Sequence, residues 1–161
     1  MWNTLWKHRQ TQKRLFQTNK MKYTLTIIKP DAISRGLEPK ITKHITDSGY
    51  QIAARKRMHL TNEDAYDFYE VHKDKPFFRA LIDYMTSGPC VFLVLRNENS
   101  ENAIEDFRKL IGSTDPAEAE EGTIRKIYAE SLERNSIHGS DSPESVIKEC
   151  DLMFPELSFN V

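Results

Sequence analysis

The sequence predicts an α+β domain in which a four-stranded antiparallel sheet packs against helices. Short apolar segments alternate with amphipathic segments of helical period, and turn residues separate them. The chain of 161 residues is long enough for one such core and short for two. No apolar run approaches the ~18 residues of a membrane-spanning helix, which excludes that class.

The first part of the chain predicts a strand, a helix and a second strand. Residues Tyr23–Lys29 are β-branched and apolar and stop at Pro30, as a buried strand would. Residues Pro39–Ser48 have a helical period and end at Gly49, a common helix terminator. Residues Tyr50–Leu60 alternate apolar and basic side chains, which predicts a half-exposed strand.

Two helices and a third strand are predicted next. Thr61 is a good N-cap for the first helix, and Asp74-Lys75-Pro76 has the composition of a start for the second. Gly88-Pro89 ends that helix. Residues Cys90–Arg96 are apolar almost throughout and predict a fully buried strand.

The last part predicts a helix over Asn99–Ile111, a loop over Ser113–Gly122, and a short strand near Ser136–His138. Ser142 and Pro143 then begin a final helix, because a hydroxyl N-cap followed by proline favours a helix start.

Without the additional helices and the long loop, this order is β-α-β-β-α-β. If the strands around residues 50–60 and 90–96 pair antiparallel, the plan is a ferredoxin-like α/β sandwich.

Charge is distributed unevenly along the chain. Residues 1–20 contain five Lys and Arg and no acid, whereas residues 21–161 hold 18 Lys and Arg against 24 Asp and Glu. The leader is compatible with an organellar transit peptide, with a disordered basic tail, or with residues upstream of a start at Met21. We therefore divide the chain into a leader, 1–20, and a domain, 21–161, located in the cytoplasm, or in mitochondria if the leader is a transit peptide. The acidic domain lacks the basic surface of a nucleic-acid binder.

Several phosphate-binding and nucleophile motifs are absent from the sequence. It contains no G-x-x-x-x-G-K-[ST] loop, no G-x-G-x-x-G and no G-x-S-x-G. The two cysteines, Cys90 and Cys150, lack metal-type spacing, and buried thiols are a better interpretation than a disulfide. Any phosphate site must be assembled from scattered cations and hydroxyls.

Four scattered residues have the chemistry for such a site. Lys29 ends the first strand, Arg108 lies late in the third helical segment, Thr114 follows Gly-Ser, and Arg125 follows Gly-Thr-Ile. Each alone reads as a surface side chain. Together they would neutralise a transferring phosphoryl group, because guanidinium groups match phosphate oxygens.

His138 is the histidine with the most favourable local context. It lies directly before Gly139 and shortly before a predicted helix N-terminus, which favours anions. A neutral imidazole held through one nitrogen can attack phosphorus with the other, and Glu149 is placed to hold it. The alternative is a turn with an ordinary surface histidine.

Five segments, "TIIKPDAISRG", "HKDKPFF", "YMTSGP", "IGSTDPAEAEEGTIRK" and "NSIHGSDSPES", together resemble the nucleoside diphosphate kinase family over Tyr23–Pro155. The resemblance implies a ping-pong reaction in which the γ-phosphate of ATP passes to His138 and then to a nucleoside diphosphate. It also implies roles for further residues: phosphate and sugar contacts for Lys29, Arg108, Thr114, Arg125 and Asn135, base stacking for Phe77, a place beside the histidine for Tyr69, and orientation of the imidazole for Ser140 and Glu149.

The resemblance also implies partners. Mg²⁺ is expected to arrive with the nucleotide's phosphates, contacting Asp141 through water. The loop at Asp115-Pro116 matches a subunit-contact loop, which predicts a homo-oligomer, a hexamer or a tetramer. Pro39 and the acidic run Asp115–Glu121 depart from the family pattern. Two rivals are a catalytically silent scaffold of the same fold and a ligand-sensing ferredoxin-like regulator.

Overall fold

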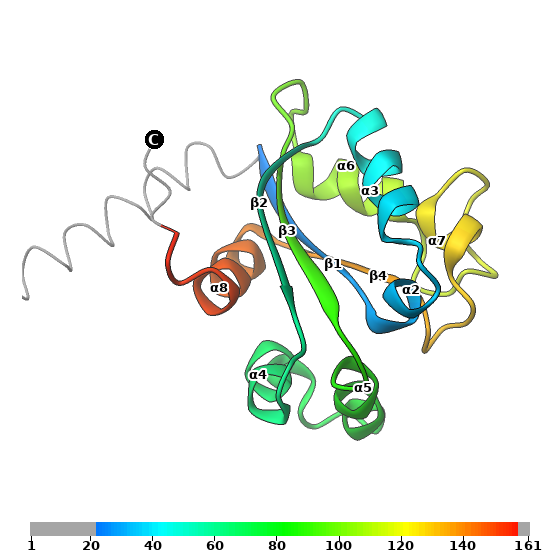
Figure 1. Ribbon diagram of the computed structural model, residues 1–161. Helices are drawn as coiled ribbons and strands as arrows, with labels where there is room; N and C mark the ends of the chain where they lie inside the picture. Colours follow the sequence, from blue (N-terminus) through cyan, green and yellow to red (C-terminus); the bar gives the residue numbers. More distant parts are fainter. Residues whose placement is uncertain (1–21, 158–161) are drawn as a thin grey trace, which may run out of the picture.

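The computed structural model describes residues 22–157, so the basic leader lies outside the described residues. Four strands form one antiparallel sheet in the order β2-β3-β1-β4, as Figure 1 shows. This order confirms the predicted ferredoxin-like α+β fold. The strands are β1 (Tyr23–Ile28), β2 (Gln51–Met58), β3 (Cys90–Arg96) and β4 (Ile137–Gly139).

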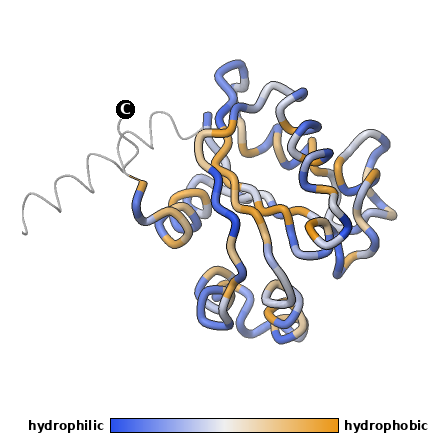
Figure 2. Tube along the Cα trace, viewed as in Figure 1, coloured by the Kyte–Doolittle hydropathy of each residue, from blue (hydrophilic) through white to orange (hydrophobic). Residues whose placement is uncertain are grey.

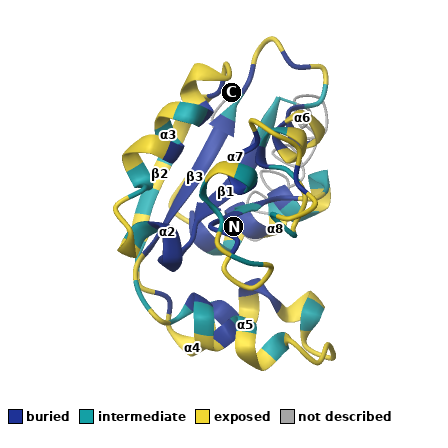
Figure 3. Cartoon of the chain, turned by 90° about the vertical axis from the view of Figure 1, so that its right-hand side faces the viewer, coloured by how far each residue is buried: buried dark blue, intermediate teal, exposed yellow. Residues whose placement is uncertain are grey.

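Both faces of the central strands are buried. Leu25 and Phe92 belong to one apolar cluster, with side chains of α4 (Asn62–Phe68), α5 (Phe78–Met85) and α8 (Pro143–Met153). Ile28 and Leu93 belong to a second cluster, with side chains of α3 (Glu38–Asp47) and α6 (Ala103–Ile111). Figure 3 shows the buried central strands β1 and β3. Helices α3 and α6, which connect the strands of the ferredoxin-like plan, therefore cover one face of the sheet. The additional helices α4, α5 and α8 cover the other face.

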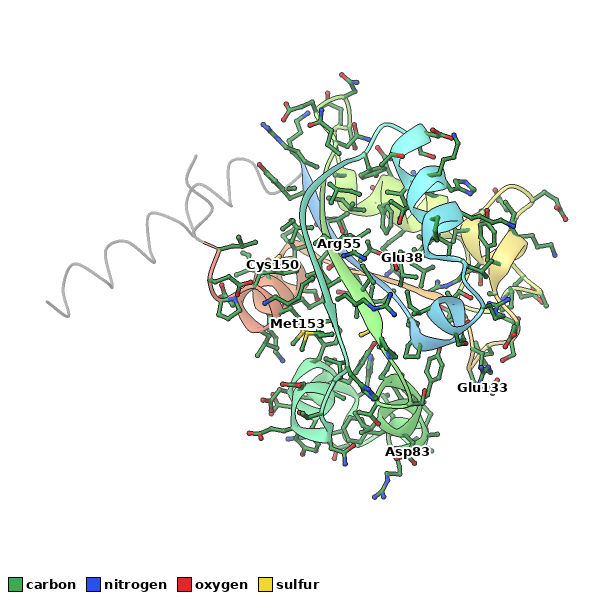
Figure 4. The ribbon with its side chains drawn as sticks, in the orientation of Figure 1. Glu38, Arg55, Asp83, Glu133, Cys150 and Met153 are labelled. Carbon is green, nitrogen blue, oxygen red and sulfur yellow. The ribbon has the colours of Figure 1, made fainter. Side chains whose placement is uncertain are left out.

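Strand β2 forms one edge of the sheet, as the order β2-β3-β1-β4 implies, and it is more exposed than the half-exposed strand that the sequence predicts, since none of its residues is buried. Figure 2 shows its hydrophilic stretch beside the hydrophobic β3. Arg55 forms an ion pair with Glu38 of α3, and Arg57 Nη1 lies 3.3 Å from the same carboxylate. Figure 4 shows Arg55 and Glu38 turned toward each other. Ion pairs thus connect the edge strand β2 to helix α3.

Two helices begin later than the sequence predicts. Helix α5 starts at Phe78 because Asp74, Lys75 and Pro76 form a turn, in which the Lys75 N–H donates to the His72 carbonyl at 2.9 Å. Helix α6 starts at Ala103, where the Asn102 side chain accepts from the Glu105 N–H at 3.2 Å. The polar side chains before α6 bind nearby backbone groups and so compete with helix formation.

Three short elements were not predicted: α2 (Pro30–Ser34), the 3₁₀ turn η1 (Glu70–His72) and α7 (Ile124–Tyr128). The predicted caps of two other helices are confirmed, with Thr61 forming a capping box on α4 and Ser142 accepting from the Ser145 N–H on α8. Among residues 22–157, no helix is long and apolar enough to span a membrane.

Both cysteines are free thiols in the core, as predicted. Burial raises the pKa of Cys90 and of Cys150 to about 12. The two thiols therefore stay protonated and contribute as small apolar side chains.

Candidate active site

His138 lies in the middle of β4, opposite Ile27 of β1. The Thr26 hydroxyl donates to the His138 carbonyl at 2.6 Å, which fixes the backbone from the neighbouring strand. The imidazole packs edge-on against Phe68, with ring centroids 5.3 Å apart, and its side chain remains 20% exposed. The ring is thus held firmly while one side stays open to a ligand.

The imidazole is oriented by one carboxylate. His138 Nε2 lies 2.9 Å from Glu149 Oε1, and Ser140 Oγ donates to Glu149 Oε2 at 2.7 Å. Because the carboxylate accepts, Nε2 carries the hydrogen, and the neutral ring keeps its lone pair on Nδ1. Within residues 22–157 no hydrogen bond occupies Nδ1. The free nitrogen is a potential nucleophile.

Two arginines flank the strand that carries the histidine. Arg125 donates to the Ile137 carbonyl at 2.8 Å and to the Gly112 carbonyl at 3.0 Å. Arg108 Nη1 lies 3.4 Å from the Gly139 carbonyl. The two guanidinium groups therefore contact the residues on either side of His138.

Lys29 adds a third cation from the end of β1. Its Nζ donates to Asn135 Oδ1 at 2.8 Å, and the side chain is buried. Burial, reinforced by the charge of Arg125, lowers the pKa of Lys29 to about 7, and Asp31 opposes this fall. Burial, reinforced by the charge of Arg108, lowers the pKa of Arg125 to about 10.

No ion pair joins Lys29, Arg108 or Arg125 to a carboxylate anywhere in the described part of the chain. Cations that depress one another's pKa and lack a carboxylate favour an anionic ligand. The buried hydroxyl of Tyr69 and Nε of Arg125 also lack a hydrogen-bond partner there. Burial raises the pKa of Tyr69, so its phenol remains a neutral donor.

Phe77 lies outside this cluster, and a row of neighbouring aromatic rings connects it to His138. Its side chain is about half exposed, at 51%, directly before α5. Its centroid is 5.6 Å from that of His72, which lies 6.5 Å from Tyr69, and Tyr69 lies 6.4 Å from His138. An exposed aromatic face next to the site is a surface on which a planar base can stack.

Two sequence-predicted residues are less closely connected. Thr114 is exposed in the loop between α6 and α7 and forms no hydrogen bond with residues 22–157. Asp141 Oδ1 accepts from Ser145 Oγ at 2.6 Å. That hydrogen bond, with a smaller contribution from the charge of Arg108, holds the pKa of Asp141 below its usual value.

The structure also brings in residues that the sequence did not reveal as part of the site. Asp31 accepts from Ser136, two residues before His138, and Thr26 donates to the His138 carbonyl. The acid directly after Pro30 is visible in the sequence, but its burial is known only from the structure. Nothing in the local sequence marks Ser136 or Thr26.

The fold and this cluster define a class of protein: an enzyme that moves phosphoryl groups, with an imidazole beside three cations. The family model described as nucleoside diphosphate kinase matches residues 22–159. The chain belongs to the nucleoside diphosphate kinase family and is a phosphotransferase.

Individual relatives agree with this membership. The chain is 50% identical over 134 residues to a nucleoside diphosphate kinase of Chlorobaculum tepidum, covering 83% of this chain and 94% of the relative. It is 50% identical over 136 residues to one of Nitratiruptor sp., covering 84% and 97%. A crystal structure of the Aquifex aeolicus nucleoside diphosphate kinase superposes with a TM-score of 0.78 at 41% identity, covering 83% and 94%.

Proposed function

We propose that this nucleoside diphosphate kinase works through a phosphohistidine at His138. The observation that carries the proposal is the imidazole whose Nε2 is bound by Glu149 at 2.9 Å while no hydrogen bond within residues 22–157 occupies Nδ1. The residues on either side of this histidine contact Arg125 and Arg108. The Nδ1 lone pair attacks the γ-phosphorus of ATP. The bond from that phosphorus to the β–γ bridging oxygen breaks, and its electrons leave with ADP.

The second half-reaction reverses these steps on another nucleotide. A terminal oxygen of the nucleoside diphosphate attacks the phosphorus on Nδ1, and the N–P bond returns its electrons to the imidazole. Glu149 stabilises the ring through Nε2–H in both directions, and Ser140 fixes the carboxylate.

Lys29, Arg108 and Arg125 neutralise the phosphate charge that moves between the two nucleotides. Asn135 and Thr114 supply polar contacts to phosphate and sugar, and Tyr69 donates its unpaired hydroxyl near the phosphate. Because Phe77 offers mainly a ring face, stacking there accounts for tolerance of different bases.

Mg²⁺ is proposed to enter with the nucleotide. Residues 22–157 contain no cluster of three or more His, Cys, Asp or Glu side chains that would hold a metal. The ionised Asp141 is a hard oxygen ligand that suits one contact through water, with the phosphates as the main ligands. When bound, the ion supplies charge neutralisation on the phosphate oxygens.

We also propose that residues 21–161 form the kinase domain and that it assembles as a homo-oligomer, a hexamer or a tetramer. The exposed edge strand β2, where Ile52 is 38% exposed, supports such contacts. Sedimentation velocity measures the number of subunits in the oligomer. The mature N-terminus isolated from cells decides between cytoplasmic and mitochondrial location.

Incubation with γ-labelled ATP tests the reaction. Acid-labile label is expected on the wild type and absent from His138→Ala, and added nucleoside diphosphate should remove it as nucleoside triphosphate. Phosphorus NMR of the denatured chain should identify the Nδ1 isomer. A folded wild type that takes no label would favour the scaffold interpretation, which no comparison supports.

A further inference from the structure

The backbone makes an unusual turn two residues before His138. Ser136 has a φ of 70° and is the single non-glycine residue with positive φ within 22–157. The Ile137 N–H donates to the Asn135 carbonyl at 2.9 Å across it. A hydrogen bond of this span around a residue of positive φ is the rarer, strained form of γ-turn. A residue with a Cβ keeps such a conformation only where its surroundings hold it.

A buried carboxylate holds this turn. Ser136 Oγ donates to Asp31 Oδ2 at 2.7 Å, and Arg35 Nη2 lies 3.0 Å from Ser136 Oγ and 3.3 Å from Asp31 Oδ2. The Tyr84 hydroxyl donates to Asp31 Oδ1. Asp31 is 1% exposed, so these three donors compensate for the water that its carboxylate loses. The carboxylate is anchored and can resist movement of the turn.

The turn at Ser136 contacts or positions three groups of the site, namely Lys29, Arg125 and His138. The Asn135 side chain accepts from Lys29 Nζ at 2.8 Å, and the Ile137 carbonyl accepts from Arg125 at 2.8 Å. The Lys29 N–H donates to the Ser136 carbonyl at 2.9 Å. His138 follows directly on β4. A rotation at Ser136 would therefore move the histidine relative to the cations.

We propose that Asp31 is a positioning residue for phosphoryl transfer, whose carboxylate holds the turn at Ser136 and thereby aims His138 and Asn135. This inference rests on the proposed role of His138 as nucleophile. Asp31 has a second effect on the site through its charge. Lys29 faces Arg125 from α7, Tyr84 from α5 and Asp31 from α2. Asp31 is the charged group among these that favours the protonated ammonium, and the Tyr84 ring, 6.0 Å from Nζ, adds a weaker cation–π attraction.

Ser136→Ala tests the turn without changing any charge. It removes the hydroxyl that donates to Asp31 and leaves the strained backbone unsupported. Single-turnover phosphorylation of His138 at saturating ATP should slow by about tenfold, because small misplacements of a nucleophile are costly. The dissociation constant for ADP should stay within about twofold. Ser48→Ala, which removes an exposed hydroxyl at the end of α3, is the matched control with wild-type kinetics.

Asp31→Asn tests the charge. The alkaline limb of kcat/KM reports loss of the Lys29 proton in the free enzyme, and it should move to lower pH by about one unit. Asp83→Asn is the matched control, since Asp83 lies on the outer side of α5 (Figure 4) and its loss should leave the profile unchanged. A role confined to stability would lower the melting temperature without moving this limb.

A wild-type phosphorylation rate in Ser136→Ala overturns the inference, whatever Asp31→Asn does. An unshifted pH profile in a folded Asp31→Asn protein overturns it equally. If Asp31→Asn does not fold, Ser136→Ala decides alone. Failure of the wild type itself to become labelled at His138 would instead refute the proposed function.

Discussion

Replacing Lys29 with methionine should make the protein more stable at low pH while it destroys activity. The pKa of Lys29 falls from 10.5 to about 7 on folding, so the native state resists protonating this buried amine. At 1.36 kcal/mol per pKa unit, the difference corresponds to about 5 kcal/mol of destabilisation. Methionine removes that cost but leaves Asn135 Oδ1 without its donor, which costs about 1–2 kcal/mol. The expected gain at pH 6 is therefore about 3–4 kcal/mol.

The sign of the pH dependence follows from proton binding. Between pH 7 and 10.5 the unfolded chain binds the Lys29 proton and the folded chain does not, so wild-type stability rises with pH over that window. The advantage of Lys29→Met should be complete below pH 7 and nearly vanish by about pH 10.

Urea unfolding followed by circular dichroism, at pH 6, 8 and 10 and equal protein concentration, measures this advantage. Lys40→Met, a substitution of an exposed lysine on α3, should change stability little at any of these pH values. Equal stability of Lys29→Met and wild type at pH 6, or a gain that is the same at pH 6 and 10, would refute the reasoning.

Three further substitutions test the site and the fold. Glu149→Gln should slow phosphorylation of His138 by about 10²-fold, because the amide no longer stabilises the imidazolium and permits the wrong tautomer; single-turnover labelling measures it. Phe77→Ala should raise KM about tenfold for all nucleotides alike, measured by coupled assay, because a stacked base loses about 1–3 kcal/mol of contact. Gly112→Ala should lower the free energy of unfolding by more than about 2 kcal/mol, since φ is 86° and the new Cβ would lie 2.5 Å from Thr123 Oγ1.

Two of the three have a matched control variant. Glu144→Gln changes an exposed acid in the first turn of α8 and should leave the phosphorylation rate intact. Losses confined to one base in Phe77→Ala would contradict stacking on a ring face. Gly122 has a φ of 85° with open space around it, so Gly122→Ala isolates backbone strain from collision. An equal loss of unfolding free energy in Gly112→Ala and Gly122→Ala would contradict the expected collision with Thr123.

The fold could be predicted from the sequence where a single physical effect dominated a segment. The apolar runs of β1 and β3 and the cap at Ser142 were readable because burial and capping act within a few residues. The start of α6 was not, because the side chains of Asn97 and Ser100 accept from the backbone N–H groups of Asn99 and Asn102 and so compete with the helix. Short helices such as α7 form by packing and carry little periodic pattern of their own.

The site was only partly readable for the same reason. The cations and His138 have distinctive chemistry, and the family resemblance joined them. The support beneath them depends on contacts between distant segments, such as Ser136 with Asp31, 105 residues apart. No local pattern encodes such a contact, because its energy exists only after the sheet has formed.

The order of elements along the chain has a consequence for synthesis. The sheet centre and Lys29 leave the ribosome early, whereas His138 on β4 and its partner Glu149 on α8 emerge last. A nascent polypeptide can therefore assemble the β1–β3 pairing while it still lacks the proposed nucleophile. On the proposed mechanism, the site is complete only after the final helix has docked, because that helix supplies the Glu149 carboxylate that binds the imidazole.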